Sequence, residues 1–365
     1  MNKLKFLGLL LFIQTGFAQQ SDFSHIDFTR ADNIAKLYKS KRLLELNKIT
    51  YDLTKDLKTD VEKLRAIYYW ITHNVANDFN LYTLNERKRS CYIKDSIKLQ
   101  NWNSKFKKKL FKKLLRKKRT ICTGYAYLLK EMSSIAGIES KMVNGIGRTS
   151  SVDIENISMP NHTWNVVKLN NKWYLCDPTW STGISFPEEG RFEFKYNDGY
   201  FLTDPKLFYQ NHYPIESKFA LLENYDDTFS SFSELPLLYG DAFTYIKEPL
   251  APKKMHHEIK QYSKFTFQYK LNKKIEKKNV KLVYFVGDDE NGLVFKDLLR
   301  KNELEETGLF EVKGRPTTVK TRVIAHDKHV LRVDEEVTDE LPDYSEFIAQ
   351  ILRIIESQKI DVILF

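Results

Sequence analysis

The sequence predicts an α+β protein, with helices early in the chain and a β-rich region after them. Apolar residues keep helical spacing over two segments, 59–76 and 123–136. Three later segments alternate apolar and polar residues, as strands do, at 138–147, 162–169 and 172–177. The second helix follows directly on Cys122, and two of the later segments carry His162 and Asp177.

The first helix has a clear start signal, because Thr59 and Glu62 have the spacing of a capping box. Its apolar positions are Val61, Leu64, Ile67, Tyr68, Ile71 and Val75. The second helix ends at Gly137 and turns one apolar side inward, made of Leu128, Leu129, Met132 and Ile135. Both segments are therefore expected to pack by one face.

The N-terminus has the pattern of an export signal. Lys3 and Lys5 precede a run from Phe6 to Ile13 that is apolar or glycine, and Gly16-Phe17-Ala18 makes a small-x-small cleavage site. The run is shorter than the roughly 20 residues that cross a bilayer. We expect residues 1–18 to be a signal peptide and the mature chain to be soluble, in the periplasm or secreted. A short apolar strand of the fold is the alternative.

Beyond the signal, the chain is long enough for two domains. Pro236, Gly240, Pro249 and Pro252 cluster in the segment 236–255. We expect a catalytic domain over 19–240 and a β-rich domain over 241–365. Strands are expected in the second domain near 265–269, 280–286 and 360–365, and a late helix near 344–355.

The net charge of +10 comes mainly from one segment. Residues 105–119 hold ten Lys or Arg and no acid, within a basic insert at about 81–119. Five apolar residues there share one side of a helix: Phe106, Leu110, Phe111, Leu114 and Leu115. The segment is a solvated helix docked by this stripe, a contact for an anionic membrane surface or polyanion, or a device that steers acidic substrates. Export and the lack of a binding motif disfavour nucleic acid.

Three cysteines are too few for a disulfide framework. Cys122 stands at the start of a predicted helix after a run of cations, and both features favour its thiolate. Cys176 is expected to be a packed strand residue, and a disulfide between Cys91 and Cys176 stays open. Gly124 is expected to keep the backbone around the sulfur open to a substrate.

The spacing of two strands predicts that His162 and Asp177 meet. If Asn170 and Asn171 form a two-residue hairpin turn, paired positions sum to 341 and Asp177 lies opposite Trp164. His162 is then the diagonal neighbour of Asp177 on the same face, about 7–8 Å away between backbones. A three-residue loop would place Asp177 on the other face and break the pair.

Chemical roles follow from this arrangement. The Cys122 thiolate attacks an amide carbonyl and forms a thioester. His162 accepts and returns the proton, while Asp177 orients its ring. The Cys122 N–H supplies half of an oxyanion hole, and Gln100 or Trp102 is the candidate for the other half. His73 and His212 lack further ligands at metal spacing, so both are expected to be structural and no metal or cofactor is expected.

The stretch 60–215 resembles the transglutaminase-like core, especially its kyphoscoliosis-peptidase-like branch. The resemblance lies in Trp70-Ile71-Thr72-His73-Asn74-Val75, Cys122-Thr123-Gly124-Tyr125-Ala126, Ala136-Gly137-Ile138, Asn161-His162-Thr163-Trp164-Asn165, Trp173-Tyr174-Leu175-Cys176-Asp177-Pro178-Thr179-Trp180, and Tyr200-Phe201-Leu202-Thr203-Asp204-Pro205 followed by His212 and Pro214. It departs from the family in the long insert between Asn77 and Arg119.

The resemblance implies a papain-like α+β fold, in which a helix carrying the cysteine packs on an antiparallel sheet carrying the histidine and aspartate. It also implies acyl transfer without a metal. Cys122, His162 and Asp177 take the places of a catalytic triad, and we expect Gly124, Trp164 and Trp180 beside the substrate. The leading hypothesis is a cysteine peptidase that acts on peptides or proteins. A protein cross-linking or deamidating enzyme and an inactive scaffold or adhesion module are the alternatives.

Overall fold

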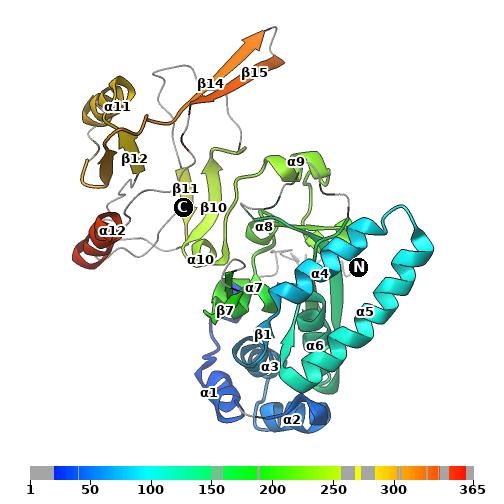
Figure 1. Ribbon diagram of the computed structural model, residues 1–365. Coiled ribbons are helices and arrows are strands. Elements are labelled where there is room, and N and C mark those ends of the chain that lie inside the picture. Colours follow the sequence, from blue (N-terminus) through cyan, green and yellow to red (C-terminus); the bar gives the residue numbers. More distant parts are fainter. Residues whose placement is uncertain are drawn as a thin grey trace, which may run out of the picture. The chain divides into compact units, whose positions relative to one another are not determined.

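The computed structural model describes residues 20–39, 41–149, 152, 154, 157, 159–186, 190–255, 268–272, 284–301, 304, 306–325, 328–335, 337 and 345–358 (Figure 1). The chain divides into two compact units, residues 1–273 and 274–365. The expected signal peptide, the strand candidate at 360–365 and the alternating residues Phe265 and Phe267 lie outside the described residues.

The first unit opens with helices. They are α1 Thr29–Leu37, α2 Leu46–Thr54, α3 Asp60–Asn74, α4 Phe79–Cys91, α5 Ser96–Lys117 and α6 Cys122–Ile135, with 3-10 turns η1 Gln20–Phe23 and η2 Leu43–Glu45. The capping box before α3 is confirmed: the Thr59 hydroxyl accepts from the Glu62 N–H, and the Glu62 carboxylate accepts from the Thr59 N–H. α6 begins at Cys122 and stops before Gly137, whose φ of +79° is in the left-handed region that glycine tolerates.

A five-stranded antiparallel sheet follows, in the order β8-β5-β4-β3-β9. Its strands are β3 Ser140–Gly147, β4 His162–Leu169, β5 Lys172–Cys176, β8 Phe201–Thr203 and β9 His212–Pro214. The predicted register is confirmed, because Asn165 pairs with Cys176 and Leu169 with Lys172. Asn170 and Asn171 both have positive φ, 49° and 63°, as a two-residue hairpin turn of the primed type requires.

Both faces of the central strand β4 are buried, because a core lies on each side of the sheet. On one side α3 and α6 contribute Tyr68, Trp70 and Tyr125 to a core that includes Val167. On the other, Trp164 and Val166 pack with residues from 200 to 246. β4 is thus buried almost throughout its length.

Short elements follow β5 and contribute to the second core and to a separate cluster around Phe232. They are α7 Pro178–Thr182, η3 Asp198–Tyr200, α8 Pro205–Phe208, η4 Ser217–Ala220, α9 Phe229–Glu234 and α10 Gly240–Phe243. The strands β6 Gly183–Phe186 and β7 Arg191–Phe194 form a separate antiparallel pair, and β1 Ala76–Asn77 pairs in parallel with β2 Arg119–Thr120.

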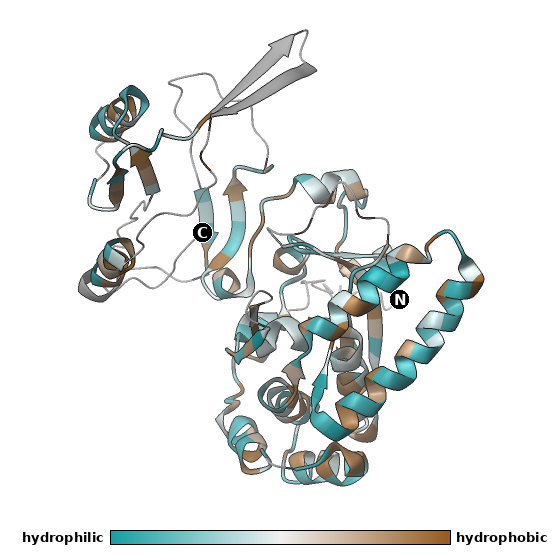
Figure 2. Cartoon of the chain, viewed as in Figure 1, coloured by the Kyte–Doolittle hydropathy of each residue, from teal (hydrophilic) through white to brown (hydrophobic). Residues whose placement is uncertain are grey.

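The basic insert folds as the helical hairpin α4–α5. The apolar stripe of α5 faces the domain, where Phe106, Leu110 and Leu114 are buried, while Leu115 stays 37% exposed. The other sides of α5 are hydrophilic along most of its length (Figure 2). This confirms a helix docked by its apolar stripe and leaves a cationic face in solvent.

The first unit continues past the expected domain boundary at 240–241. Pro249 lies inside β10 Ile246–Ala251, which pairs with β11 Gln268–Leu271. Ile246 is buried in the second core, and Tyr269 packs against that core. The cluster of Pro and Gly therefore belongs to packed structure, and the compact units divide between Lys273 and Lys274. Whether residues 241–365 fold independently stays a prediction.

The second unit contains as much helix as strand within its described residues. β12 Tyr284–Gly287 and β13 Leu309–Val312 pair in parallel and are joined through α11 Glu290–Lys301. β14 Val319–Ala325 and β15 Lys328–Glu335 form an antiparallel pair, and α12 Ser345–Gln358 follows. The late helix is confirmed, and the described part of this unit is mixed. Of all the helices that the structure describes, none has both the length and the apolar content to cross a bilayer.

One prediction concerns the tyrosine that ties α3 to the sheet. The buried Tyr68 hydroxyl contacts the carbonyl oxygens of Asp177 and Tyr200, each at 2.9 Å, and the Ser181 hydroxyl at 2.5 Å. Tyr68→Phe removes these contacts from a buried site, although each carbonyl keeps a backbone N–H donor, so we expect the free energy of unfolding to fall by about 1–3 kcal/mol. Urea denaturation followed by circular dichroism measures it. Tyr69→Phe is the control, because no hydrogen bond of its hydroxyl is seen among the described residues. Equal losses in the two variants would contradict the prediction.

Candidate functional site

Cys122 is the first residue of α6. The segment that precedes it is held in place by the short parallel pair of strands β1 and β2. The Asp78 N–H donates to the Thr120 carbonyl at 2.8 Å, and the Ala76 N–H donates to the Lys118 carbonyl at 2.8 Å. These bonds hold the segment before Cys122 against the end of α3. Cys122 as a whole residue is 7% exposed, so it is buried in the resting structure.

Gly124 has a packing role that differs from the one expected. It is buried, and a Cβ added to it would lie 1.8 Å from the Thr120 Oγ1 and 2.9 Å from the Thr120 Cβ. The missing side chain lets α6 approach β2 closely. Gly124 therefore positions the cysteine helix, and it does not open the backbone to a substrate.

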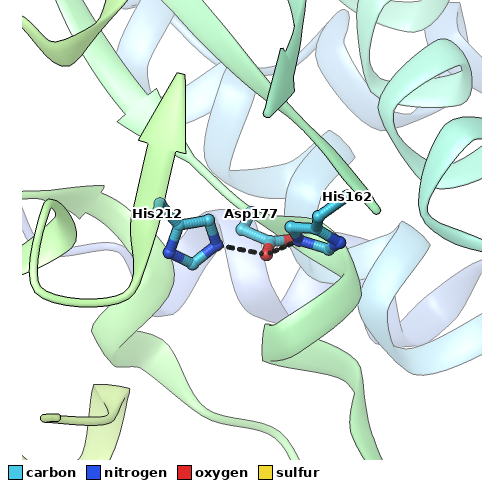
Figure 3. A group of neighbouring side chains, drawn as sticks. All are labelled: His162, Asp177 and His212. Atoms are coloured by element: carbon cyan, nitrogen blue, oxygen red, sulfur yellow. Dashed lines mark hydrogen bonds and ion pairs between the residues drawn. The ribbon is translucent and has the colours of Figure 1, made fainter. Parts of the chain in front are cut away.

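His162 and Asp177 meet as the hairpin register predicts. The His162 Nε2 lies 2.7 Å from the Asp177 Oδ2, and the Asp177 side chain has no exposed surface (Figure 3). The other carboxylate oxygen, Oδ1, caps α7, accepting from the Thr179 N–H at 2.8 Å and the Trp180 N–H at 3.2 Å. The cap of α7 thus fixes the carboxylate that faces His162.

The electrostatics of the three groups are coupled. Burial raises the pKa of the Cys122 thiol, but its hydrogen bond to His162 and the charge of that ring outweigh burial and lower the pKa overall. Burial lowers the pKa of His162, but Asp177 and Cys122 together raise it to about 10. Burial also opposes ionisation of Asp177, yet His162 and His212 hold its pKa well below the usual range. Since Nε2 faces Asp177, Nδ1 is the His162 nitrogen left for Cys122.

The structure adds a fourth group that sequence reasoning assigned to a structural role. The His212 Nε2 lies 3.0 Å from the same Asp177 Oδ2, on the side opposite His162 (Figure 3). Burial lowers the pKa of His212 to about 4, against the influence of Asp177. In the sequence, the block from Tyr200 to Pro214 indicated that this region belongs to the family's pattern. Nothing in that block predicted that His212 would pair with Asp177.

Aromatic rings enclose the two imidazoles. Trp180 lies 5.2 Å from His162 and 4.4 Å from His212 between ring centroids, and it is partly exposed. Trp164 is fully buried in the second core. Of the three residues expected beside a substrate, Trp180 alone has surface to offer one, while Trp164 and Gly124 are packing residues.

The oxyanion candidates upstream of the cysteine are placed on α5. Gln100 is exposed, and the Trp102 indole N–H donates to the Asn85 side-chain oxygen at 3.0 Å within the α4–α5 hairpin. At the cysteine itself, the cap residue of α6 is Ile121, whose side chain makes no cap hydrogen bond. The first-turn N–H groups of α6 consequently receive no side-chain acceptor from their cap, which suits an oxyanion.

His162, Asp177 and His212 also satisfy the composition of a metal site, since their ligand atoms lie within 4.8 Å of one another. The 2.7 Å and 3.0 Å contacts converge on a single oxygen, an arrangement of two donors on one acceptor. His73 stacks on Tyr69, with its Nδ1 2.8 Å from the Tyr69 carbonyl oxygen. Its structural assignment agrees with this packing.

The remaining cysteines are free. Cys176 is buried in β5 and Cys91 is exposed at the end of α4. Burial raises the pKa of Cys176 to about 12. Cys176 is therefore a packed thiol, and the disulfide alternative is not formed.

Comparisons with known proteins were consistent with this architecture. Residues 47–178 match the transglutaminase-like superfamily. The chain is 31% identical to the kyphoscoliosis peptidase of Mus musculus over 49% of this chain and 24% of that protein. It is 24% identical to hillarin of Drosophila melanogaster over 60% of this chain and 26% of that protein. The chain thus spans about a quarter of the length of these relatives.

Two other similarities are more limited. A segment of 65 residues, 18% of this chain, is 42% identical to the bifunctional protein HldE of Helicobacter pylori (strain HPAG1), over 14% of that protein. A solved structure described as a TGase aligns with a TM-score of 0.25 and 16% identity, over 44% of this chain and 37% of that one.

The close approach of α6 to β2 gives a stability prediction. Gly124→Ala improves helix propensity but drives a methyl group into Thr120, so we expect a net loss of about 1–3 kcal/mol. Thr120→Ala removes the nearest atom of the clash, and the double variant should lose less than the sum of the single variants. Urea denaturation of the four proteins measures the coupling. Additive losses, or a stabilised Gly124→Ala, would show that the contact is not restrictive.

Proposed function

We infer that this member of the transglutaminase-like superfamily, which carries the family's core at residues 47–178, is a thiol enzyme that cleaves amide bonds of peptides or proteins. Cys122 is proposed as the nucleophile, His162 as the general acid and base, and Asp177 as the group that orients His162. The similarity to proteins called kyphoscoliosis peptidase supports the choice of peptide bonds.

One observation carries the proposal: a buried thiol, imidazole and carboxylate are electrostatically coupled. His162 lowers the pKa of the Cys122 thiol, Cys122 and Asp177 raise the pKa of His162, and the His162 Nε2 lies 2.7 Å from the Asp177 Oδ2. The thiol pKa is lowered although burial opposes it. A buried structural cysteine would have a raised pKa, as Cys176 has.

In the first step, the Cys122 sulfur attacks the carbonyl carbon of the bound amide. The carbonyl π electrons move to oxygen, and the Cys122 N–H at the start of α6 stabilises that oxyanion. The C–N bond then breaks, and the leaving amine takes the proton from the His162 Nδ1. The product is a thioester on Cys122 and a neutral His162.

In the second step, His162 accepts a proton from water as the water oxygen attacks the thioester carbon. The C–S bond breaks, the sulfur leaves as thiolate, and a carboxylic acid is released that ionises in solution. His162 is again an imidazolium beside a thiolate. Asp177 stays ionised throughout, because its role is to stabilise the charged ring.

The cationic face of α5 suggests the kind of substrate. Its exposed basic residues are Lys105, Lys107, Lys108, Lys109, Lys112, Arg116 and Lys117. The apolar stripe of α5 packs on the domain, so the exposed face contacts partners by charge. α5 leads through β2 directly to Cys122. We propose that acidic segments of substrates are drawn to this face, with an anionic membrane surface as the competing partner.

Export completes the proposal. The N-terminal pattern of residues 1–18 supports a reaction in the periplasm or outside the cell. Water is there the abundant acceptor for the thioester.

The pH dependence of Cys122 alkylation by iodoacetamide tests the proposed network. The thiolate forms above a lowered thiol pKa, and His162 remains charged up to about pH 10. We expect alkylation of the wild type, located by mass spectrometry, to persist well below pH 8. In His162→Ala the acid limb should move toward the ordinary thiol value of about 8.5.

Cys176→Ala is the matched control, and it should leave the profile unchanged. If the pH profile of Cys122 alkylation is that of an ordinary thiol and His162→Ala does not change it, an inactive scaffold is favoured. Incorporation of amines in preference to hydrolysis, measured with a labelled amine and a peptide library, would instead favour a cross-linking enzyme.

Electrostatic steering is tested with two alkylating agents of different charge. Iodoacetate is anionic and iodoacetamide neutral, so the ratio of their rates at Cys122 reports attraction to the site. The triple variant Lys112→Glu, Arg116→Glu, Lys117→Glu should lower this ratio by roughly tenfold at low ionic strength. The difference should shrink as salt screens the charges.

A variant with the same change of net charge provides the control. Lys41→Glu, Arg42→Glu, Lys58→Glu alters exposed positions elsewhere on the first unit. An equal fall in the ratio for both variants would attribute the effect to net charge alone. Loss of binding to anionic vesicles in the α5 variant, with an unchanged ratio, would favour the membrane partner.

A further inference from the structure

His212 is the buried group beside the site that the proposed mechanism leaves unused. It lies on β9 with no exposed side-chain surface. β9 pairs with β3, where His212 stands opposite Gly147, and a Cβ added to Gly147 would lie 2.9 Å from the His162 Cβ. The sheet therefore brings two histidines from distant parts of the chain to one carboxylate.

Hydrogen-bond chemistry fixes what each ring contributes. Asp177 is ionised, since its pKa is held well below the usual range, and a carboxylate can only accept. The nitrogens at 2.7 Å and 3.0 Å from its Oδ2 must both carry protons. His162 consequently keeps its Nε2 proton, and its Nδ1 is the atom that exchanges a proton with Cys122.

His212 is held rigidly in this role. Its ring stacks on Phe208 at 3.9 Å with an interplanar angle of 23°, and Trp180 lies 4.4 Å away. Its second nitrogen, Nδ1, contacts the Asn211 side-chain oxygen, Oδ1, at 2.5 Å. A ring packed on both sides and bonded at both nitrogens cannot turn its Nε2 away from Asp177 without disrupting its neighbours.

We propose that His212 is a positioning residue: its Nε2–H holds the Asp177 carboxylate ionised and aimed at His162, so that the working unit is Cys122–His162–Asp177–His212. This rests on the proposed function. Asp177 Oδ1 is committed to α7 and Oδ2 has two lone-pair directions, one for each imidazole. With His212 in one direction, His162 is confined to the other.

Few other groups near Asp177 change their protonation between about pH 4 and 9, the range in which alkylation is measured. Burial raises the pKa of the thiol and phenol groups around it, which belong to Cys176, Tyr68, Tyr125 and Tyr200. Between about pH 4 and 9 the profile therefore reports Cys122 together with His162, Asp177 and His212.

The test replaces the ring donor and keeps the packing. In His212→Phe the carboxylate loses one donor and its ionised form is less favoured. We expect Cys122 alkylation at pH 7 to slow by roughly tenfold, the equivalent of one hydrogen bond to a charged group. The acid limb should move up by about one pH unit, because Asp177 supports the imidazolium less well.

Rescue separates positioning from packing. His212→Gln retains an N–H donor and should recover most of the rate and the acid limb. His73→Phe, which changes a histidine stacked on Tyr69 outside the network, should leave both unchanged. A wild-type profile in His212→Phe, or equal loss in His212→Phe and His212→Gln, would overturn the proposal.

Nuclear magnetic resonance of ¹⁵N-histidine-labelled protein tests the same bond without activity. The wild type should show two protected, downfield Nε2–H protons, and His212→Phe should remove one and shift the other. A single such proton would overturn the proposal even if Cys122 is reactive. Two protons with an unreactive Cys122 would support the His212 bond and count against the proposed function. Stoichiometric Zn²⁺ binding that displaces both protons would reassign the cluster as a metal site.

Discussion

The structure around the site depends on one buried charge. Asp177 has no exposed side-chain surface, and an ionised carboxylate inside a protein is costly unless hydrogen bonds replace water. Four N–H donors do so here, two from the backbone of α7 and two from imidazole rings. Because each donor comes from a fixed element, the carboxylate constrains where α7 starts, how β4 is registered and where β9 lies.

The part of this arrangement that is local in sequence could be predicted. A primed two-residue turn needs positive φ at both positions, which asparagine accepts, and the turn then sets every pairing in the β4–β5 hairpin. A slip by one residue would have moved Asp177 to the opposite face. The cysteine at a helix start and the capping box of α3 were predictable for the same reason, since each depends on residues a few positions apart.

The parts that depend on distant segments could not be predicted. His212 is 35 residues from Asp177, and its approach follows from β9 joining β3 across the sheet. Gly124 suggested openness although Thr120 is only four residues away, because their spacing does not show that the chain folds back there and packs Thr120 where a side chain would be. The Pro and Gly cluster near 240 suggested a linker, yet Ile246 and Tyr269 pack on the second core. In each case tertiary packing determined which interpretation is correct, because the local sequence pattern did not distinguish between them.

The basic insert is bound, through the cap of its first helix, to the segment that presents Cys122. Asp78 is buried, caps α4, and joins its backbone N–H to the Thr120 carbonyl, while Lys113 of α5 forms an ion pair with its carboxylate. One turn along α4, Tyr82 packs against an apolar cluster that includes Ile121, and burial, Glu86 and Cys122 raise the pKa of Tyr82. The insert thus combines a cationic outer face with an inner face that contacts the residues around the cysteine.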